Sequence, residues 1–177
     1  MVLYHRNRVP GATYFFTVAL RDRTSRVLTA HVEELRRAYA GTRSKRPFET
    51  VALVILPDHI HAIWRLPEGD ADYSGRWRAI KAAFVLNLWR NGVVATTNAR
   101  REAGVWQRRF WEHTIRNEAG LRAHVDYVHW NPVKHEHVEC VSEWPHSSFH
   151  RYVREGVLPN DWGGTNVLRG RGRSFGE

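Results

Sequence analysis

Short stretches of branched and aromatic residues predict a series of β-strands. Four stretches share this composition, at 14–20, 48–56, 59–66 and 110–115. The stretch 48–56 is almost continuously apolar, so we expect it to be central in a sheet and covered on both faces. Pro57 and Asp58 follow it and predict a tight turn, so 48–56 and 59–66 should form a hairpin.

Apolar residues that recur every three or four positions predict helices between these strands. The helical segments are 26–39, 75–90, 118–131 and a short one near 147–155. A serine or asparagine suited to cap the first turn precedes three of them, at Ser25, Ser74 and Asn117. Pro132 is expected to end the third helix, because proline has no N–H to donate.

The order of these elements predicts an α+β fold. Strand, helix, two strands, helix, strand and helix follow one another, which favours a single central antiparallel sheet of four to five strands flanked by helices. We expect the hairpin 48–66 at the centre of that sheet. A chain of 177 residues can bury one sizeable core. We assign residues 1–163 to a single domain and residues 164–177, rich in arginine and glycine, to a flexible basic tail.

Charge points to a polyanionic partner. The formal net charge is +9, and between Arg76 and Arg109 eight residues are Lys or Arg while only Glu102 is acidic. Such a bias favours contact with a phosphate backbone. Tryptophans interspersed with these charges could stack on unpaired bases where they are exposed, although we expect Trp77 to pack in the core.

Cysteine content and hydropathy bear on the compartment. Cys140 is the one cysteine, which excludes an internal disulfide and a cysteine-based zinc site. The longest apolar run, 51–56, is too short to cross a membrane, and the N-terminus lacks the apolar stretch of a signal peptide. We therefore expect a cytoplasmic, nucleoid-associated protein with no membrane partner.

His59 and His61 are the first candidates for chemistry. Residues i and i+2 of a strand point to the same face, so the two imidazoles could share one metal ion. Ile60, Ala62 and Trp64 then supply an apolar opposite face. The chain has eleven histidines, so the pair could also arise by chance, with one ring exposed and the other hydrogen-bonded.

Tyr127 and Asn131 are the second candidates. They are four residues apart on a predicted helix and therefore neighbour each other on one face. A carboxamide oxygen could be a third ligand beside two imidazoles, in a site suited to Mg²⁺ or Mn²⁺ and also able to hold other metals such as Zn²⁺. A tyrosine beside a metal-bound phosphate is a plausible nucleophile. The alternative is structural, with Asn131 ending the helix before Pro132 and Tyr127 packing.

Four stretches carry a resemblance to a known family. They are YHRNRVPGATYFFTV (4–18), VILPDHIH (54–61), VWQRRFWEH (105–113) and DYVHWNPVKH (126–135). In order and spacing the chain resembles the REP-associated tyrosine transposases, in the single-tyrosine branch of the HUH (His-hydrophobe-His) endonucleases and transposases. The match spans about residues 4–163 and implies an HUH-type αβ sandwich.

The resemblance implies a set of site residues. His59 and His61 would be metal ligands for Mg²⁺ or Mn²⁺, and Tyr127 the nucleophile. Asn131 would be a third ligand, at a position where the broader single-tyrosine group usually has glutamine.

The resemblance also implies a DNA partner, a single-stranded or hairpin DNA from a REP palindrome with a short unpaired guide. The candidate contacts to it are Arg6, Arg8, Lys81, Arg108 and Arg109. A monomer and a homodimer both stay open.

The implied reaction is metal-dependent cleavage through a 5′-phosphotyrosine, with rejoining by a 3′-OH. A phenol is a poor nucleophile at neutral pH. The metal, His124 or His129 could activate it, and the sequence does not choose among them. Two alternatives stay open. One is a non-catalytic, sequence-specific DNA-binding or regulatory relative, and the other is a hydrolytic metallonuclease without a covalent intermediate.

Overall fold

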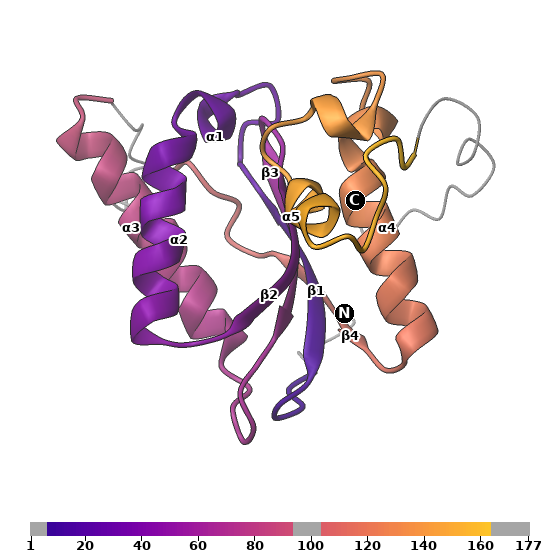
Figure 1. The fold of residues 1–177 in the computed structure, drawn as a ribbon. Coiled ribbons are helices and arrows are strands. Elements are labelled where there is room, and N and C mark those ends of the chain that lie inside the picture. The colour runs from indigo at the N-terminus through magenta and orange to yellow at the C-terminus, as the bar shows by residue number, and fades with distance from the viewer. Residues whose placement is uncertain (1–6, 94–103, 164–177) are drawn as a thin grey trace, which may run out of the picture.

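One antiparallel sheet of four strands separates two layers of helices (Figure 1). A computed structural model describes residues 7–93 and 104–163. The strands are β1 (Thr13–Ala19), β2 (Glu49–Ile55), β3 (His59–Arg65) and β4 (Trp111–Ile115), in the order β2-β3-β1-β4. The predicted tail 164–177 lies outside the described residues, as do residues 1–6 and 94–103.

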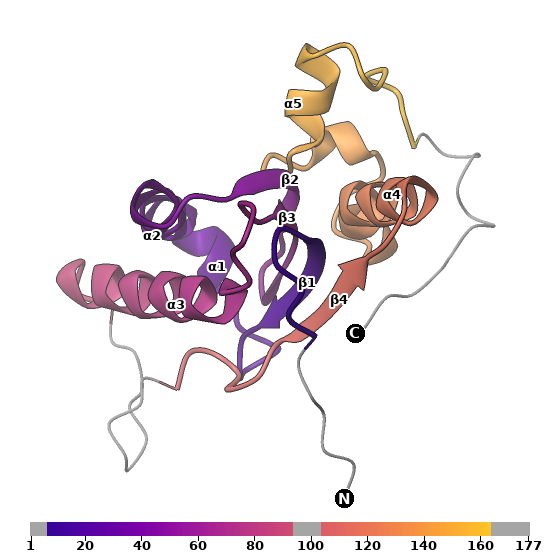
Figure 2. The same cartoon turned by 90° about the horizontal axis from the view of Figure 1, so that it is seen from below.

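The helices lie on both faces of the sheet (Figure 2). They are α1 (Val27–Ala30), α2 (Val32–Lys45), α3 (Tyr73–Arg90), α4 (Glu118–Lys134) and α5 (Phe149–Arg154), with a 3-10 turn η1 (Val141–Glu143). Helices α2 and α3 cover one face, while α4 packs on β2 and β3 from the other. No helix in the described part of the chain is long and apolar enough to span a membrane.

Aromatic side chains fill the layer between the sheet and helices α2 and α3. The Trp64 and Trp77 rings stack with their centroids 4.3 Å apart, and Phe16 lies 4.9 Å from Trp64. Phe15, the neighbour of Phe16 on β1, belongs instead to the smaller core under α4. The alternation along β1 thus supplies both cores, and the predicted packing of Trp77 is confirmed.

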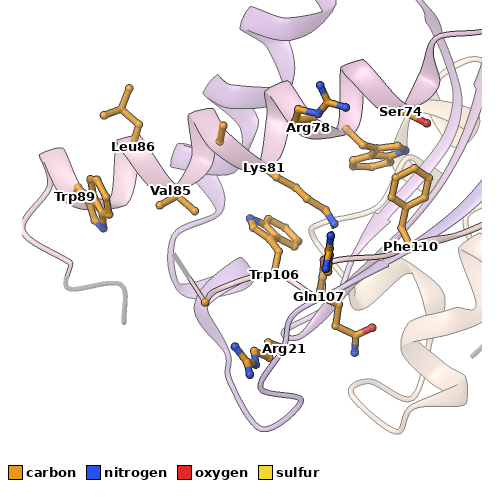
Figure 3. Close-up of a pocket in the computed structure, with 14 residues that line it drawn as sticks. Arg21, Ser74, Arg78, Lys81, Val85, Leu86, Trp89, Trp106, Gln107 and Phe110 are labelled. Carbon is orange, nitrogen blue, oxygen red and sulfur yellow. Dashed lines mark hydrogen bonds between the residues drawn. The ribbon is translucent and has the colours of Figure 1, made fainter. Parts of the chain in front are cut away.

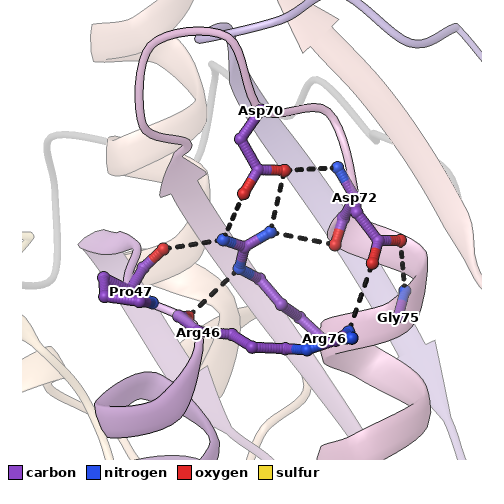
Figure 4. A network of polar contacts seen from close by, with 6 residues as sticks. All are labelled: Arg46, Pro47, Asp70, Asp72, Gly75 and Arg76. Carbon is purple, nitrogen blue, oxygen red and sulfur yellow. Dashed lines mark hydrogen bonds and ion pairs between the residues drawn. The ribbon is translucent and has the colours of Figure 1, made fainter.

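A buried arginine fastens the start of α3. Arg76 is 3% exposed, and its guanidinium donates to both carboxylate oxygens of Asp70 at 3.1 and 2.6 Å. It also donates to three backbone carbonyl oxygens, those of Arg46, Pro47 and Asp72 (Figure 4). Arg76 thereby ties three separate backbone segments together at one end of the sheet.

The central position predicted for the stretch 48–56 is wrong. It forms β2, an edge strand, whereas β3 and β1 are the two central strands. The C-terminal segment covers the outer edge instead. His146 O accepts from Ile55 N at 2.9 Å, Ser148 N donates to Leu53 O at 2.7 Å, and the Arg151 guanidinium donates to Val51 O. An edge strand can therefore be as apolar as a central one, because a later part of the chain buries it. The predicted β2–β3 hairpin is confirmed.

Pro132 does not end α4, contrary to prediction. The helix continues to Lys134, and Asn131 O accepts from His135 N at 3.0 Å beyond it. Proline removes one donor of the helical ladder, but packing of α4 on β2 and β3 outweighs that local cost. Asn131 therefore lies inside the helix.

Two other helix boundaries differ from prediction. The segment 26–39 divides at His31 into α1 and α2, and α2 extends to Lys45. Asp72, rather than Ser74, caps α3 by accepting a hydrogen bond from Gly75 N at 2.8 Å. Asn117 caps α4 as predicted, with its side chain accepting from Gly120 N at 2.8 Å.

Candidate active site

The central strand β3 places two histidines side by side under α4. The ring centroids of His59 and His61 are 4.8 Å apart, and the side chains are 2% and 0% exposed. Ile60 and Ala62 point the other way and join the aromatic core under α2 and α3. The predicted alternation along this strand is confirmed.

A neighbouring side chain holds each imidazole through its Nδ1 atom. His59 Nδ1 lies 2.8 Å from Asp58 Oδ1, and His61 Nδ1 lies 3.0 Å from Thr17 Oγ1. An ionised carboxylate can only accept, so His59 Nδ1 donates, and in the neutral form of the ring Nε2 then carries the lone pair. The Nε2 atoms of His59 and His61 are buried and have no hydrogen-bond partner among the described residues.

The surroundings of His61 and Asp58 favour a neutral imidazole and an ionised carboxylate. Burial first, and then the charges of His59, His135 and Lys134, lower the pKa of His61 well below its ordinary value, so the ring stays neutral. Burial alone would raise the pKa of Asp58, but its hydrogen bond to His59 and the nearby Arg23 lower it to about 2. A neutral imidazole whose other nitrogen is held by a hydrogen bond, as that of His61 is by Thr17, is suited to bind a metal ion.

Helix α4 presents a row of side chains to the histidine pair. The ring centroids of Tyr127 and His61 are 5.2 Å apart. His135 lies just past the helix end, and its ring centroid is 5.2 Å from that of His59. Asn131 is one helical turn from Tyr127 and therefore shares its face of the helix. Its side chain is 0% exposed, and its Oδ1 and Nδ2 atoms have no hydrogen-bond partner in the described part of the chain.

The donor set fits a divalent metal ion. In residues 7–93 and 104–163 no group of three His, Cys, Asp or Glu side chains is placed to hold a metal. A site here would therefore use His59 Nε2, His61 Nε2 and the amide oxygen of Asn131. Leaving a buried amide unpaired costs about 1–3 kcal/mol, and a bound ligand would remove that cost. All of these residues and Tyr127 belong to one chain, so a second copy is not needed to bring them together.

Comparisons with known proteins place the chain in a family. No protein-family model matches it. A REP-associated tyrosine transposase of Haemophilus influenzae is 47% identical over 171 residues, which cover 96% of this chain and 97% of that protein. One from Escherichia coli K12 is 49% identical over 161 residues, covering 91% of this chain and 90% of that protein. The chain belongs to the REP-associated tyrosine transposases.

A solved structure supports both the family and the fold. A REP-associated tyrosine transposase bound to a REP hairpin is 45% identical and has a TM-score of 0.82, with 100% of each chain covered. The predicted α+β fold with one flanked antiparallel sheet is confirmed. As a member of this family, the protein is an enzyme that cleaves and transfers DNA strands with a tyrosine nucleophile.

In this transposase the side chain beside the Tyr127 hydroxyl is one that the sequence had not suggested. Lys134 Nζ lies 3.4 Å from Tyr127 Oη and 5.1 Å from the centroid of its ring. The two residues are seven apart, which places them on one face of a helix. That signal was available in the sequence but was lost when Pro132 was expected to end the helix.

The two histidines considered as activators of the tyrosine have other contacts. His129 Nε2 lies 3.0 Å from Ser148 Oγ, and the ring packs on Tyr152, so it braces α4 against the C-terminal segment. His124 Nδ1 lies 2.7 Å from Gly120 O in the preceding turn. Because His129 is directed toward α5, it does not suit the role of activating group.

The candidate DNA contacts of the transposase are spread over its surface. Lys81 and Arg108 line a groove of about 960 Å³ between α3 and the segment 104–110 (Figure 3). Arg8 and Arg109 are exposed, and Arg6 lies outside the described residues. Lys81 donates to Gln107 O at 3.0 Å, so it also holds the wall of the groove.

The groove combines positive charge with aromatic surface. Arg21 and Arg78 add to the charge of Lys81 and Arg108, and none of the described residues that line the groove is acidic. Trp89, on the outer turn of α3, is 49% exposed. The groove lies on the α3 side of the sheet, whereas the histidine pair faces α4. Sequence reasoning found the charge bias but not the groove, which depends on how α3 packs beside the segment before β4.

Proposed function

We propose that this transposase cleaves single-stranded DNA beside a REP-type hairpin through a 5′-phosphotyrosine on Tyr127. One observation carries the proposal. Tyr127 packs on His61, one of two neighbouring buried histidines whose Nε2 atoms have no protein partner among the described residues, and Asn131, one helical turn away, is buried with its amide atoms likewise unpaired. Buried polar atoms without hydrogen-bond partners lower the stability of a fold, but they are available to bind a ligand.

His59, His61 and Asn131 would hold the metal, which we propose to be Mg²⁺ or Mn²⁺. When bound, the metal would supply positive charge to a non-bridging oxygen of the scissile phosphate. Asp58 and Thr17 hold the two imidazoles in place, so the donors are oriented before the ligand arrives. Burial under α4 limits the access of water to the site.

Tyr127 supplies the nucleophile in this proposal. A lone pair of Oη forms the bond to phosphorus, the phenolic proton passes to solvent, and the bond to the 3′-oxygen breaks. The 3′-oxygen leaves with the electron pair and takes up a proton. The covalent product conserves the phosphodiester bond energy, so a 3′-OH can reverse the step and join strands.

The partner is carried over from the structural relative, which was solved with a REP hairpin. We propose that the groove beside α3 contributes to DNA binding, with its arginines on phosphates and Trp89 available for stacking on an unpaired base. The DNA would then contact both faces of the sheet. Action on chromosomal DNA would place the enzyme in the cytoplasm at the nucleoid.

The test uses a labelled oligonucleotide with a REP-type hairpin and a single-stranded flank, with and without Mn²⁺, resolved on a denaturing gel. We expect a protein–DNA adduct that requires Mn²⁺ and is absent in Tyr127→Phe, which should still bind the hairpin. Tyr152→Phe is a matched control, since its phenol donates to Val51 O away from the site. Cleavage that persists in Tyr127→Phe would identify a hydrolytic nuclease. Hairpin binding by the wild type without cleavage would identify a non-catalytic relative.

A further inference from the structure

We propose that the Lys134 ammonium is a catalytic cation, which stabilises negative charge on Tyr127 Oη while the bond from this oxygen to phosphorus forms or breaks. The inference rests on the proposed phosphotyrosine chemistry. It adds a residue that neither the histidine pair nor the metal would replace, because those act on the phosphate and not on the tyrosine oxygen.

Geometry is the first support. Lys134 Nζ lies 3.4 Å from Tyr127 Oη and 5.1 Å from the ring centroid, so the ammonium sits near the hydroxyl and the ring face together. This placement depends on α4 continuing beyond Pro132 to Lys134. A helix that ended at Asn131 would not fix the lysine on the face that carries the tyrosine.

The length of the contact agrees with the proposed role. At 3.4 Å it is longer than a strong charge-assisted hydrogen bond, which is about 2.7–2.9 Å. The phenol is neutral before reaction and attracts an ammonium weakly. As charge develops on Oη the attraction grows, and catalytic contacts often shorten only in the reacting complex. A lysine suits this, because its charge sits on a flexible stem with three donors.

Burial makes a counter-charge necessary. Tyr127 is 7% exposed and packs on the rings of Phe15 and His61. A negative oxygen in such surroundings is poorly solvated, and burial of an uncompensated charge is costly. Lys134, two turns further along the helix, is exposed. It can therefore reach the oxygen without its own charge being buried.

The same cation would act in both directions of the reaction. In cleavage, Oη gives a lone pair to phosphorus and loses its proton, with the developing charge beside the ammonium. In rejoining, a 3′-oxygen loses its proton to solvent and forms the new bond to phosphorus. The electron pair of the Oη–phosphorus bond then returns to Oη, again beside Lys134, and the oxygen is reprotonated from solvent.

The experiment measures both half-reactions at saturating hairpin oligonucleotide and Mn²⁺. In Lys134→Met we expect adduct formation and rejoining each to slow by about 100-fold, the scale for removing one donor to a developing oxyanion. Hairpin affinity should stay within about twofold, since one exposed cation contributes little to the total charge. Lys134→Arg, which keeps the charge, should recover part of the rate. Arg122→Met removes an exposed cation from the same helix and should react as the wild type.

A fluorinated tyrosine at position 127 separates a chemical role from a structural one. Its oxygen is a better leaving group, so the defect of Lys134→Met in rejoining should shrink by about tenfold. Equal defects with both tyrosines, wild-type rates in Lys134→Met, or a loss confined to hairpin affinity would each overturn the proposal. If Lys134→Met does not fold, the same comparison is made with Lys134→Arg. Its rejoining rate is measured with tyrosine and with fluorinated tyrosine at position 127, and equal defects would again overturn the proposal. No adduct in the wild type would instead reject the underlying phosphotyrosine chemistry.

Discussion

Two polar clusters in this transposase, each centred on buried side chains, are built in opposite ways. Around Arg76 the guanidinium meets a carboxylate and three backbone carbonyl oxygens at 2.6–3.2 Å (Figure 4). In the cluster of His59, His61 and Asn131, the two Nε2 atoms and both amide atoms have no hydrogen-bond partner in the described residues. The Arg76 side chain is as deeply buried as those of His59, His61 and Asn131, so burial of the central groups does not distinguish the two clusters.

The difference indicates that the first cluster stabilises the fold and the second is suited to bind a ligand. A buried charge that is fully hydrogen-bonded holds segments in register, and removal of one member leaves its partners unpaired. Buried polar atoms without partners cost stability in the absence of a ligand. A fold can retain such atoms where a bound ligand replaces the hydrogen bonds to water that burial removes. We therefore expect mutations in the first cluster to change stability, and mutations in the second to change activity with little loss of stability.

The largest effect should follow loss of a histidine. His61→Ala removes one of two proposed imidazole ligands, so we expect DNA cleavage to fall by about a thousandfold, since the charge of a bound metal contributes several kcal/mol to the barrier. Calorimetric titration with Mn²⁺ should show a matching loss of affinity. Wild-type Mn²⁺ affinity in His61→Ala would contradict the assignment of the ligand.

The second effect should be on stability alone. Arg76→Met removes the guanidinium that donates to the Asp70 carboxylate and to three carbonyl oxygens, so we expect the free energy of unfolding to fall by about 3 kcal/mol. Urea denaturation measures this. Arg78→Met, an exposed neighbour on α3, should stay within about 0.5 kcal/mol of the wild type. If both variants lose the same stability, the network around Arg76 has no special role.

A third substitution tests the unpaired amide directly. Asn131→Leu has a similar volume and removes two buried polar atoms that lack partners, so the metal-free protein should gain about 1 kcal/mol in free energy of unfolding. Mn²⁺ affinity should fall by about tenfold. A loss of stability would show that Asn131 supports the fold, which would remove the contrast between the two clusters.

The smallest effect should be a change in the pH dependence of stability. The hydrogen bond from Arg76 lowers the pKa of Asp70 below its ordinary value. Between that lowered pKa and about pH 4, the unfolded chain binds more protons than the folded one, so stability falls as the pH decreases through this window. Denaturation at several pH values below 5 should show a shallower dependence in Arg76→Met. An unchanged slope would mean that the ion pair contributes nothing.

Local patterns predicted much of the fold and which of the candidate site residues share a face. The β2–β3 hairpin, the cap at Asn117 and the helical character of the long apolar segments depend on neighbours in sequence. The positions of Tyr127 and Asn131 on one helix face follow from the same periodicity. The predicted centre of the sheet and the predicted end of α4 were both wrong, because each is decided by contacts between distant segments.

The sequence by itself determined which side chains share a face. His59 and His61 are two apart on a strand, and Tyr127 and Asn131 are four apart on a helix, so backbone geometry alone pairs them. Only the tertiary structure decided that α4 lies over β3, that it continues through Pro132, and that Lys134 therefore reaches the tyrosine oxygen. The physical reason is that packing of α4 on the sheet gains more free energy than one missing helical hydrogen bond costs, and no local pattern contains that balance.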